Sequence, residues 1–256
     1  MRRPFWIFLI LITAGYLAFW FLLIAATAGF STPQAWLQTL VKPEIRYAAG
    51  LSVLTCTAAA ALALLFAVPI GYLMARRDFP GKTWVDAALD IPIVLPPMVV
   101  GICLLIFFQT SLGRRIEAML PFTYTIAGVV LAQFVVAAAF AIRTMRGTFD
   151  HLSPRPEQVA LTLGATDFQA FRHVALRTAR RGMVAAFCIS WARSLGEFGP
   201  ILVFAGATRM KTEVLPTTVW LELSVGNLDS AVAVSLAMIA LAILVLALVR
   251  TTGERV

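Results

Sequence analysis

The amino-acid sequence predicts an all-α, polytopic membrane protein with six transmembrane helices, and three observations support this fold class. Of its 256 residues, 60% are hydrophobic and 13% are charged, whereas soluble domains average about 45–50% apolar and about 25% charged residues. Six apolar stretches approach the length of about 20 residues that a spanning helix needs. Lysine and arginine flank these stretches, so the net charge of +8 indicates membrane flanks rather than a nucleic-acid partner.

The six expected spans follow one another along the chain. Their approximate bounds are 5–29, 49–75, 91–108, 123–142, 183–206 and 230–249. The first one resembles a secretory signal, but the uncharged stretch from Pro4 to Val41 is longer than the apolar region of a signal peptide, which has about 7–15 residues. We therefore expect the first span to be retained.

The third expected span is interrupted by Pro92, Pro96 and Pro97. Proline lacks a backbone donor and breaks or kinks a helix. Broken helices at membrane depth are tolerated only where protein or a water-filled cavity covers them. Pro96 and Pro97 are therefore candidates for the lining of a pathway, and a turn at the membrane surface is the alternative.

The distribution of basic residues sets the expected orientation. With the N-terminus inside, the cytoplasmic segments hold 14 of the 21 lysines and arginines, the outer loops hold 6, and Arg193 lies within a span. Because lysine and arginine are enriched in cytoplasmic loops, we expect a multi-pass protein of the cytoplasmic (inner) membrane with both termini in the cytoplasm. The longest cytoplasmic segment, residues 143–182, lies between the fourth and fifth spans.

This cytoplasmic segment contains the pattern of a polar helical hairpin. Glu157 suits the positive end of a short helix, and Gly164 can end that helix because glycine accepts positive φ. Thr166 and Gln169 have the spacing of a capping box, which predicts that a second helix starts at once. Apolar residues on this second helix, among them Phe168, indicate a contact surface for a partner.

The hairpin resembles a motif of the permease subunits of ABC importers, E-A-A-x-x-x-G followed nine residues later by I-x-L-P. This chain has Q-V-A-L-T-L-G at 158–164 and V-A-L-R at 174–177. The glycine, the spacing and the position before the fifth span agree with the motif. Three positions depart from it, because Gln158 replaces the glutamate, Val159 replaces an alanine and Arg177 replaces the proline that normally ends the second helix.

The resemblance implies the type I ABC importer fold, in which the hairpin is a coupling helix that docks on the ATP-binding subunit. It implies a first helix and outer loop at 1–47, a transmembrane domain at 48–250 with the coupling hairpin at 156–177, and a cytoplasmic tail at 251–256. The residues that it places at or near the ATPase contact are Glu157, Ala160, Gly164, Ala165, Thr166, Asp167 and Phe168.

The fifth span contains two charges, Arg193 and Glu197, four residues apart on one helix face. A charge at the bilayer centre costs roughly 2.5–3.5 kcal/mol on insertion scales. The pair is either an internal ion pair that faces protein or a part of the pathway or of a subunit interface. Gly196 and Gly199 allow a kink or a close backbone approach beside it.

The segment A-R-S-L-G-E-F-G, residues 192–199, is similar to the permeases for the tetrahedral oxyanions molybdate, tungstate and sulfate. The run L-P-P-M-V-V-G-I-C-L-L at 95–105 also resembles their third span. The short chain and the six spans favour molybdate or tungstate, with a sulfate or thiosulfate permease as the alternative. A secondary transporter is a more remote alternative, since ionisable residues and broken helices also mark such proteins.

The resemblance also sets the expected partners. It implies two ATP-binding cassette subunits, a second permease subunit that is most simply a second copy of this chain, and an extracytoplasmic oxyanion-binding protein. ATP and Mg²⁺ are expected on the ATP-binding subunits, so this chain is expected to be no enzyme and to work by alternating access. Pro80–Thr83 resembles a phosphate-binding loop, but Arg76 stands where that loop needs a glycine. We expect no catalytic residue, cofactor or metal in the chain, since no histidine or cysteine has metal-ligand spacing.

Overall fold

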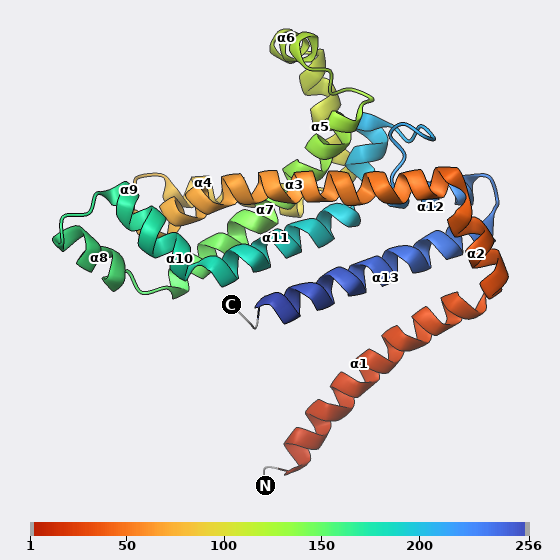
Figure 1. Ribbon diagram of the computed structural model, residues 1–256, viewed down its shortest axis with the longest axis horizontal. Coiled ribbons are helices and arrows are strands. Elements are labelled where there is room, and N and C mark those ends of the chain that lie inside the picture. Colours follow the sequence, from red (N-terminus) through yellow and green to blue (C-terminus); the bar gives the residue numbers. More distant parts are fainter. Residues whose placement is uncertain (1–2, 254–256) are drawn as a thin grey trace.

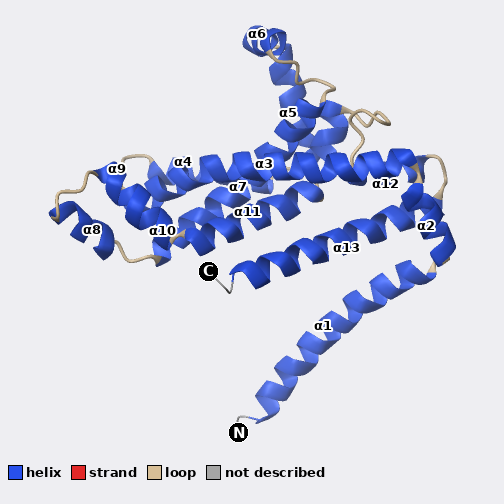
Figure 2. Ribbon diagram, in the orientation of Figure 1, coloured by secondary structure: helices blue, strands red, loops and turns tan. Residues whose placement is uncertain are grey.

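The computed structural model describes residues 3–253, and this part of the chain is helical with connecting loops and no strand (Figures 1 and 2). The all-α fold class is confirmed. Residues 254–256 of the expected tail lie outside the described residues. The helices are α1 (Arg3–Gly29), α2 (Pro33–Val41), α3 (Pro43–Arg76), α4 (Lys82–Val94), α5 (Pro97–Gln109), α6 (Ser111–Met119), α7 (Ile126–His151), α8 (Arg155–Thr162), α9 (Asp167–Ala170), the π-helix η1 (Phe171–Ala175), α10 (Leu176–Thr178), α11 (Arg180–Leu195), the π-helix η2 (Ile201–Ala205), α12 (Leu215–Ser224) and α13 (Leu228–Gly253).

The core of the molecule lies where α3, α7 and α11 run side by side (Figure 1). Small side chains line these contacts, and Ala63, Ala67, Ala137 and Ala141 are completely buried. At Gly71, a Cβ atom would lie 2.8 Å from the backbone nitrogen of Arg146. Small residues let helix backbones approach closely where no hydrophobic force drives helices together in lipid.

Among the described residues, four helices are long and apolar enough to cross a membrane, and these are α1, α3, α7 and α13. The third expected span is a bent pair, because α4 and α5 meet at an angle of 108°. Pro96 and Pro97 lie at this bend, where Pro96 is extended and Pro97 starts α5. The prolines explain the break, since neither can donate a backbone hydrogen bond.

The fifth expected span is also interrupted. Helix α11 ends at Leu195 after 16 residues, residues 196–198 are not helical, and the helix resumes at Gly199 before η2. The fourth span is longer than the sequence indicates, because α7 continues to His151. Four of the six expected spans are therefore continuous helices, and the third and fifth are broken.

Helix α1 stands apart from the bundle. None of its apolar window is buried inside the described chain, and Figure 1 shows it leaving the bundle near α2 and running away from it. Its exposed side chains include Phe8, Ile12 and Leu22. This surface is suited to lipid or to another protein chain, because it is apolar throughout.

Candidate functional site

The helical hairpin predicted from the sequence is present at one end of the bundle (Figure 1). Helix α8 ends before Gly164, whose φ is +89°. Thr166 then caps α9: its Oγ1 accepts a hydrogen bond from the backbone nitrogen of Gln169 at 3.2 Å, and its own backbone nitrogen donates to Gln169 Oε1 at 2.8 Å. The glycine turn and the capping box are both confirmed as local structure.

The turn of the hairpin carries an exposed apolar surface. Leu163 is 82% exposed, Phe168 is 66% exposed and Val159 is 57% exposed. Gly164, Thr166 and Asp167 are exposed beside them, while Ala160 and Ala165 are partly covered. Exposed apolar patches of this kind mark contact sites, so this end of the hairpin is available to a partner.

Glu157 differs from the other hairpin residues because its side chain is buried against the bundle. Its Oε1 accepts hydrogen bonds from Arg76 Nη2 at 2.9 Å and from Arg76 Nε at 3.2 Å, and its Oε2 accepts one from Tyr72 Oη at 2.7 Å. Sequence reasoning grouped Glu157 with the partner-contact residues and missed Arg76 and Tyr72. Nothing local signals these contacts, because Arg76 is 81 residues away in the chain.

The second arm of the hairpin ends without the proline of the motif. Helix α10 ends at Thr178, Ala179 leaves helical geometry, and α11 begins at Arg180. Arg180 Nε donates to the backbone oxygen of Arg177 at 3.1 Å, and a cation that binds a terminal carbonyl stabilises a helix end. The second arm therefore ends at Thr178, one residue after Arg177, without a proline.

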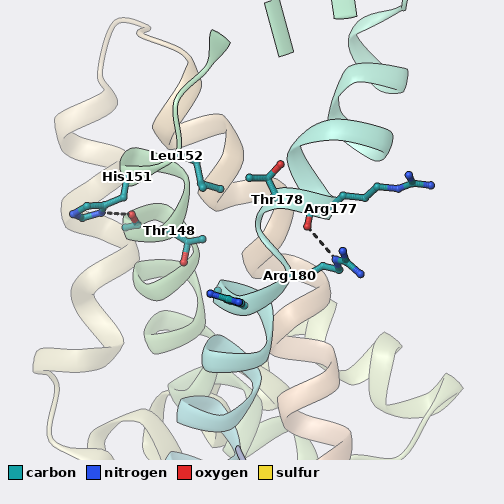
Figure 3. Close-up of a pocket in the computed structure, with 9 residues that line it drawn as sticks. Thr148, His151, Leu152, Arg177, Thr178 and Arg180 are labelled. Atoms are coloured by element: carbon teal, nitrogen blue, oxygen red, sulfur yellow. Dashed lines mark hydrogen bonds between the residues drawn. The ribbon is translucent and has the colours of Figure 1, made fainter. Parts of the chain in front are cut away.

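A cavity of about 610 Å³ lies between the end of α7 and the junction of α10 with α11 (Figure 3). Its lining includes Thr148, His151, Arg177, Arg180 and Arg181. Figure 3 shows that the side chains of Arg177 and Arg180 extend to one side while His151 extends to the other. These three side chains therefore do not converge on one point of the cavity.

The charged pair of the fifth span is an ion pair. Arg193 Nη1 lies 2.6 Å from Glu197 Oε2, and the side chains are 28% and 1% exposed. The guanidinium carbon of Arg193 also lies 5.7 Å from the centroid of the Phe140 ring. Within the described residues, neither carboxylate oxygen of Glu197 receives a hydrogen bond of good geometry. The pair is therefore close in distance but incompletely satisfied.

The breaks in the third and fifth spans pack directly against each other. A Cβ atom on Gly199 would lie 2.9 Å from the backbone nitrogen of Met98 and 3.3 Å from the backbone carbon of Pro97. A Cβ atom on Gly101 would lie 2.9 Å from the Cα of Pro200. Two segments that the sequence singles out separately thus form one contact, and sequence reasoning missed Gly101. Pro96 precedes this contact as the N-cap of α5, and Gly196 ends α11 on its other side.

The fold and the hairpin define a class of protein, a multi-pass membrane subunit with a helical hairpin exposed at one end of its bundle. The family model described as "binding-protein-dependent transport system inner membrane component" matches residues 67–256. The chain therefore belongs to this family of ABC importer permeases and is an inner-membrane protein.

Several relatives are named as oxyanion permeases. A molybdate/tungstate transport system permease protein of Thermococcus kodakarensis is 40% identical over 169 residues, which cover 66% of this chain and 64% of the relative. A probable molybdenum ABC transporter permease of Haloferax volcanii is 33% identical over 97% of this chain and 91% of its own. A sulfate transport system permease protein of Escherichia coli is 31% identical over 88% and 82%.

A solved structure supports the fold. A bacterial ABC transporter for import of the acidic polysaccharide alginate has a chain with a TM-score of 0.74, which covers 99% of this chain and 97% of that one at 15% identity. At this identity the likeness shows the fold alone. The type I ABC importer fold implied by the motif is therefore confirmed.

Proposed function

We propose that this chain is the permease subunit of an ATP-driven importer that carries a tetrahedral oxyanion, molybdate or tungstate, across the cytoplasmic membrane. The observation that carries the substrate class is the likeness to relatives named for molybdate, tungstate and sulfate at 31–40% identity. The segment around Arg193 and Glu197 also resembles oxyanion permeases. Sulfate or thiosulfate is the alternative substrate, since a sulfate permease is among the relatives. A secondary transporter is not retained, because the chain belongs to a binding-protein-dependent family.

The hairpin is the proposed docking element for an ATP-binding subunit. Its exposed apolar residues, Leu163 and Phe168, suit a groove on a partner that binds ATP and Mg²⁺ and carries out hydrolysis. Gly164, Ala165, Thr166 and Asp167 lie at the turn and would share this contact. Two ATP-binding subunits would serve two permease subunits, most simply two copies of this chain.

The transport step is proposed to be alternating access. Closure of the ATP-bound subunits would move the hairpins, and the permease dimer would open toward an extracytoplasmic binding protein. One solved relative in fold is an alginate importer in complex with its substrate-bound periplasmic protein. The hairpin end of the bundle, and both termini, would then face the cytoplasm. The ion pair of Arg193 with Glu197 and the packed breaks at Pro97 and Gly199 are the proposed places where a pathway or a dimer contact forms.

Reconstitution tests this function. The chain, its ATP-binding subunit and the binding protein in proteoliposomes should accumulate tungstate or molybdate only when ATP is present. Calorimetry on the binding protein with molybdate, tungstate and sulfate decides among the oxyanions. Uptake that continues without ATP, or no uptake of any of the three anions by an assembled complex, would reject the proposal.

A further inference from the structure

The first arm of the hairpin, α8, is attached to the bundle through a buried polar cluster, which we call the hairpin joint and which consists of Tyr72, Arg76 and Glu157. Arg76 and Glu157 form a salt bridge with side chains only 13% and 10% exposed. Apart from this cluster, the first arm of the hairpin, α8, packs mainly against the second arm. Within the described residues, Glu157 makes the side-chain hydrogen bonds that join α8 to α3.

Arg76 connects three elements at once. Besides its two hydrogen bonds to Glu157, its Nη1 donates to the backbone oxygen of Phe149 at 2.7 Å and its Nη2 donates to that of Leu152 at 3.0 Å. These oxygens lie at the end of α7, where carbonyls lack partners within the helix. The planar guanidinium offers several donors in a fixed arrangement, so one side chain fixes the end of α7 and the start of α8 to α3.

Tyr72 connects the joint to the second arm of the hairpin. Its hydroxyl donates to Glu157 on α8, and its ring centroid lies 4.6 Å from that of Phe171 in η1. The same ring meets Phe149 of α7 edge-on at 5.3 Å. Both arms of the hairpin therefore contact the same two consecutive turns of α3.

We propose that the hairpin joint transmits movement of the hairpin to α3 and α7, and that Glu157 is a positioning residue that acts through Arg76 rather than a contact for the ATP-binding subunit. The inference rests on the proposed function, since it assumes that an ATP-binding subunit moves the hairpin. A charged hydrogen-bonded pair held away from water resists separation, because removing either partner leaves a buried charge unpaired. Displacement of α8 therefore displaces the ends of α3 and α7 with it.

Three variants test the joint in the assembled transporter. Glu157→Gln keeps the shape of the side chain and removes its charge. Tyr72→Phe keeps the aromatic ring and removes the hydrogen bond to Glu157. Arg76→Lys keeps the positive charge but lacks the planar guanidinium that bonds several partners at once. The matched control is Asp78→Asn, which breaks the exposed ion pair of Asp78 with Lys82 at 2.8 Å near the same end of α3.

Coupling is measured as oxyanion imported per ATP hydrolysed. We expect Glu157→Gln to lower this ratio by a factor of about 5 or more, in line with usual coupling strengths between sites, while the ATP-binding subunit still co-purifies. Tyr72→Phe and Arg76→Lys should lower it less, and Asp78→Asn should leave it unchanged. A structural defect alone would lower assembly, hydrolysis and import together and leave the ratio unchanged. If both Glu157→Gln and Arg76→Lys imported as much oxyanion per ATP hydrolysed as wild type, the proposed role of the hairpin joint would be rejected.

A second measurement does not depend on transport. In the isolated permease, Glu157→Gln should speed hydrogen exchange of the backbone amides of 155–163, because loss of the charge weakens the attachment of α8 to α3, and Asp78→Asn should not. Unchanged hydrogen exchange in Glu157→Gln would reject the hairpin joint as the attachment of α8, even if the proposed transport function is correct. Failure of the wild-type chain to import an oxyanion would reject the proposed function. The hydrogen-exchange result would then still test whether the hairpin joint attaches α8 to α3.

Discussion

At the scale of single residues, Gly164 is the position with the strictest requirement for a residue without a Cβ atom. Its φ of +89° suits glycine, and a Cβ there would meet no atom of the described chain within 4 Å, so within the permease itself a substitution acts through backbone strain. Gly164→Val should cost about 1–2 kcal/mol of local stability, since left-handed geometry is unfavourable for a side chain with a Cβ. ATPase stimulation and transport should fall together while membrane insertion survives.

The matched control for this variant is Gly50→Ala. Gly50 lies inside α3 and also has no atom within 4 Å of a Cβ, but its φ is not positive. Alanine is favoured over glycine within a helix, so transport should be retained. Normal stimulation of the ATPase by Gly164→Val would contradict the assignment of the hairpin as the coupling element.

A second residue, Glu213, predicts a pH dependence. It is completely buried in the loop before α12, its Oε1 accepts a hydrogen bond from Thr218 Oγ1 at 2.9 Å, and its Oε2 has no partner among the described residues. Burial raises the pKa of this carboxyl because the charged form loses hydration, while the hydrogen bond from Thr218 and, next, the charge of Arg209 oppose the shift. The folded state therefore binds this proton more readily than the unfolded state, and stability declines as pH rises from the ordinary value through the raised pKa.

Glu213→Gln should remove this part of the decline. We expect a higher unfolding temperature than wild type at pH 8 and a smaller difference at pH 4, measured by scanning fluorimetry on the purified permease. A variant less stable than wild type at pH 8 would show that its neighbours, first Thr218 and then Arg209, stabilise the carboxylate.

At the scale of elements, the contact between the third and fifth spans is built on glycine. Gly199→Ala and Gly101→Ala each place a Cβ about 2.9 Å from the backbone of the other span. Overpacking of this kind costs typically about 1–3 kcal/mol, so both variants should unfold at lower temperature than wild type and than Gly50→Ala. Unfolding temperatures equal to that of wild type would show that the two spans can move apart to accommodate a Cβ without loss of stability.

The hairpin shows which features a sequence can predict. Its turn and its capping box depend on neighbours within four residues, so the pattern around Gly164 and Thr166 was enough to predict them. The joint between Glu157 and Arg76 depends on how α3 and α8 meet in space, and no local pattern encodes that. The break in the third span is also a local feature, so its prolines predicted it. The packing of Gly101 on Pro200 joins segments that are distant in the sequence, so it appears only in the structure.

At the scale of the whole molecule, the charge distribution predicts the topology. The hairpin turn and the loop that carries Lys211 lie at opposite ends of the bundle (Figure 1). A cysteine at Lys211 should react with an impermeant reagent from outside, and one at Asp167 should not, in a background without Cys103, which is exposed. The reverse pattern of labelling would invert the predicted orientation.

The measurement that tests the central claim most directly is a photo-crosslink from the turn of the hairpin in the assembled transporter. A crosslinking residue at Leu163, which is 82% exposed, should capture the ATP-binding subunit. The same residue at Leu223 of α12, at the other end of the bundle and 49% exposed, should not capture it. Capture of the ATP-binding subunit from Leu223, or its absence from Leu163 in a complex that hydrolyses ATP, would contradict the hairpin as the element that links ATP to transport.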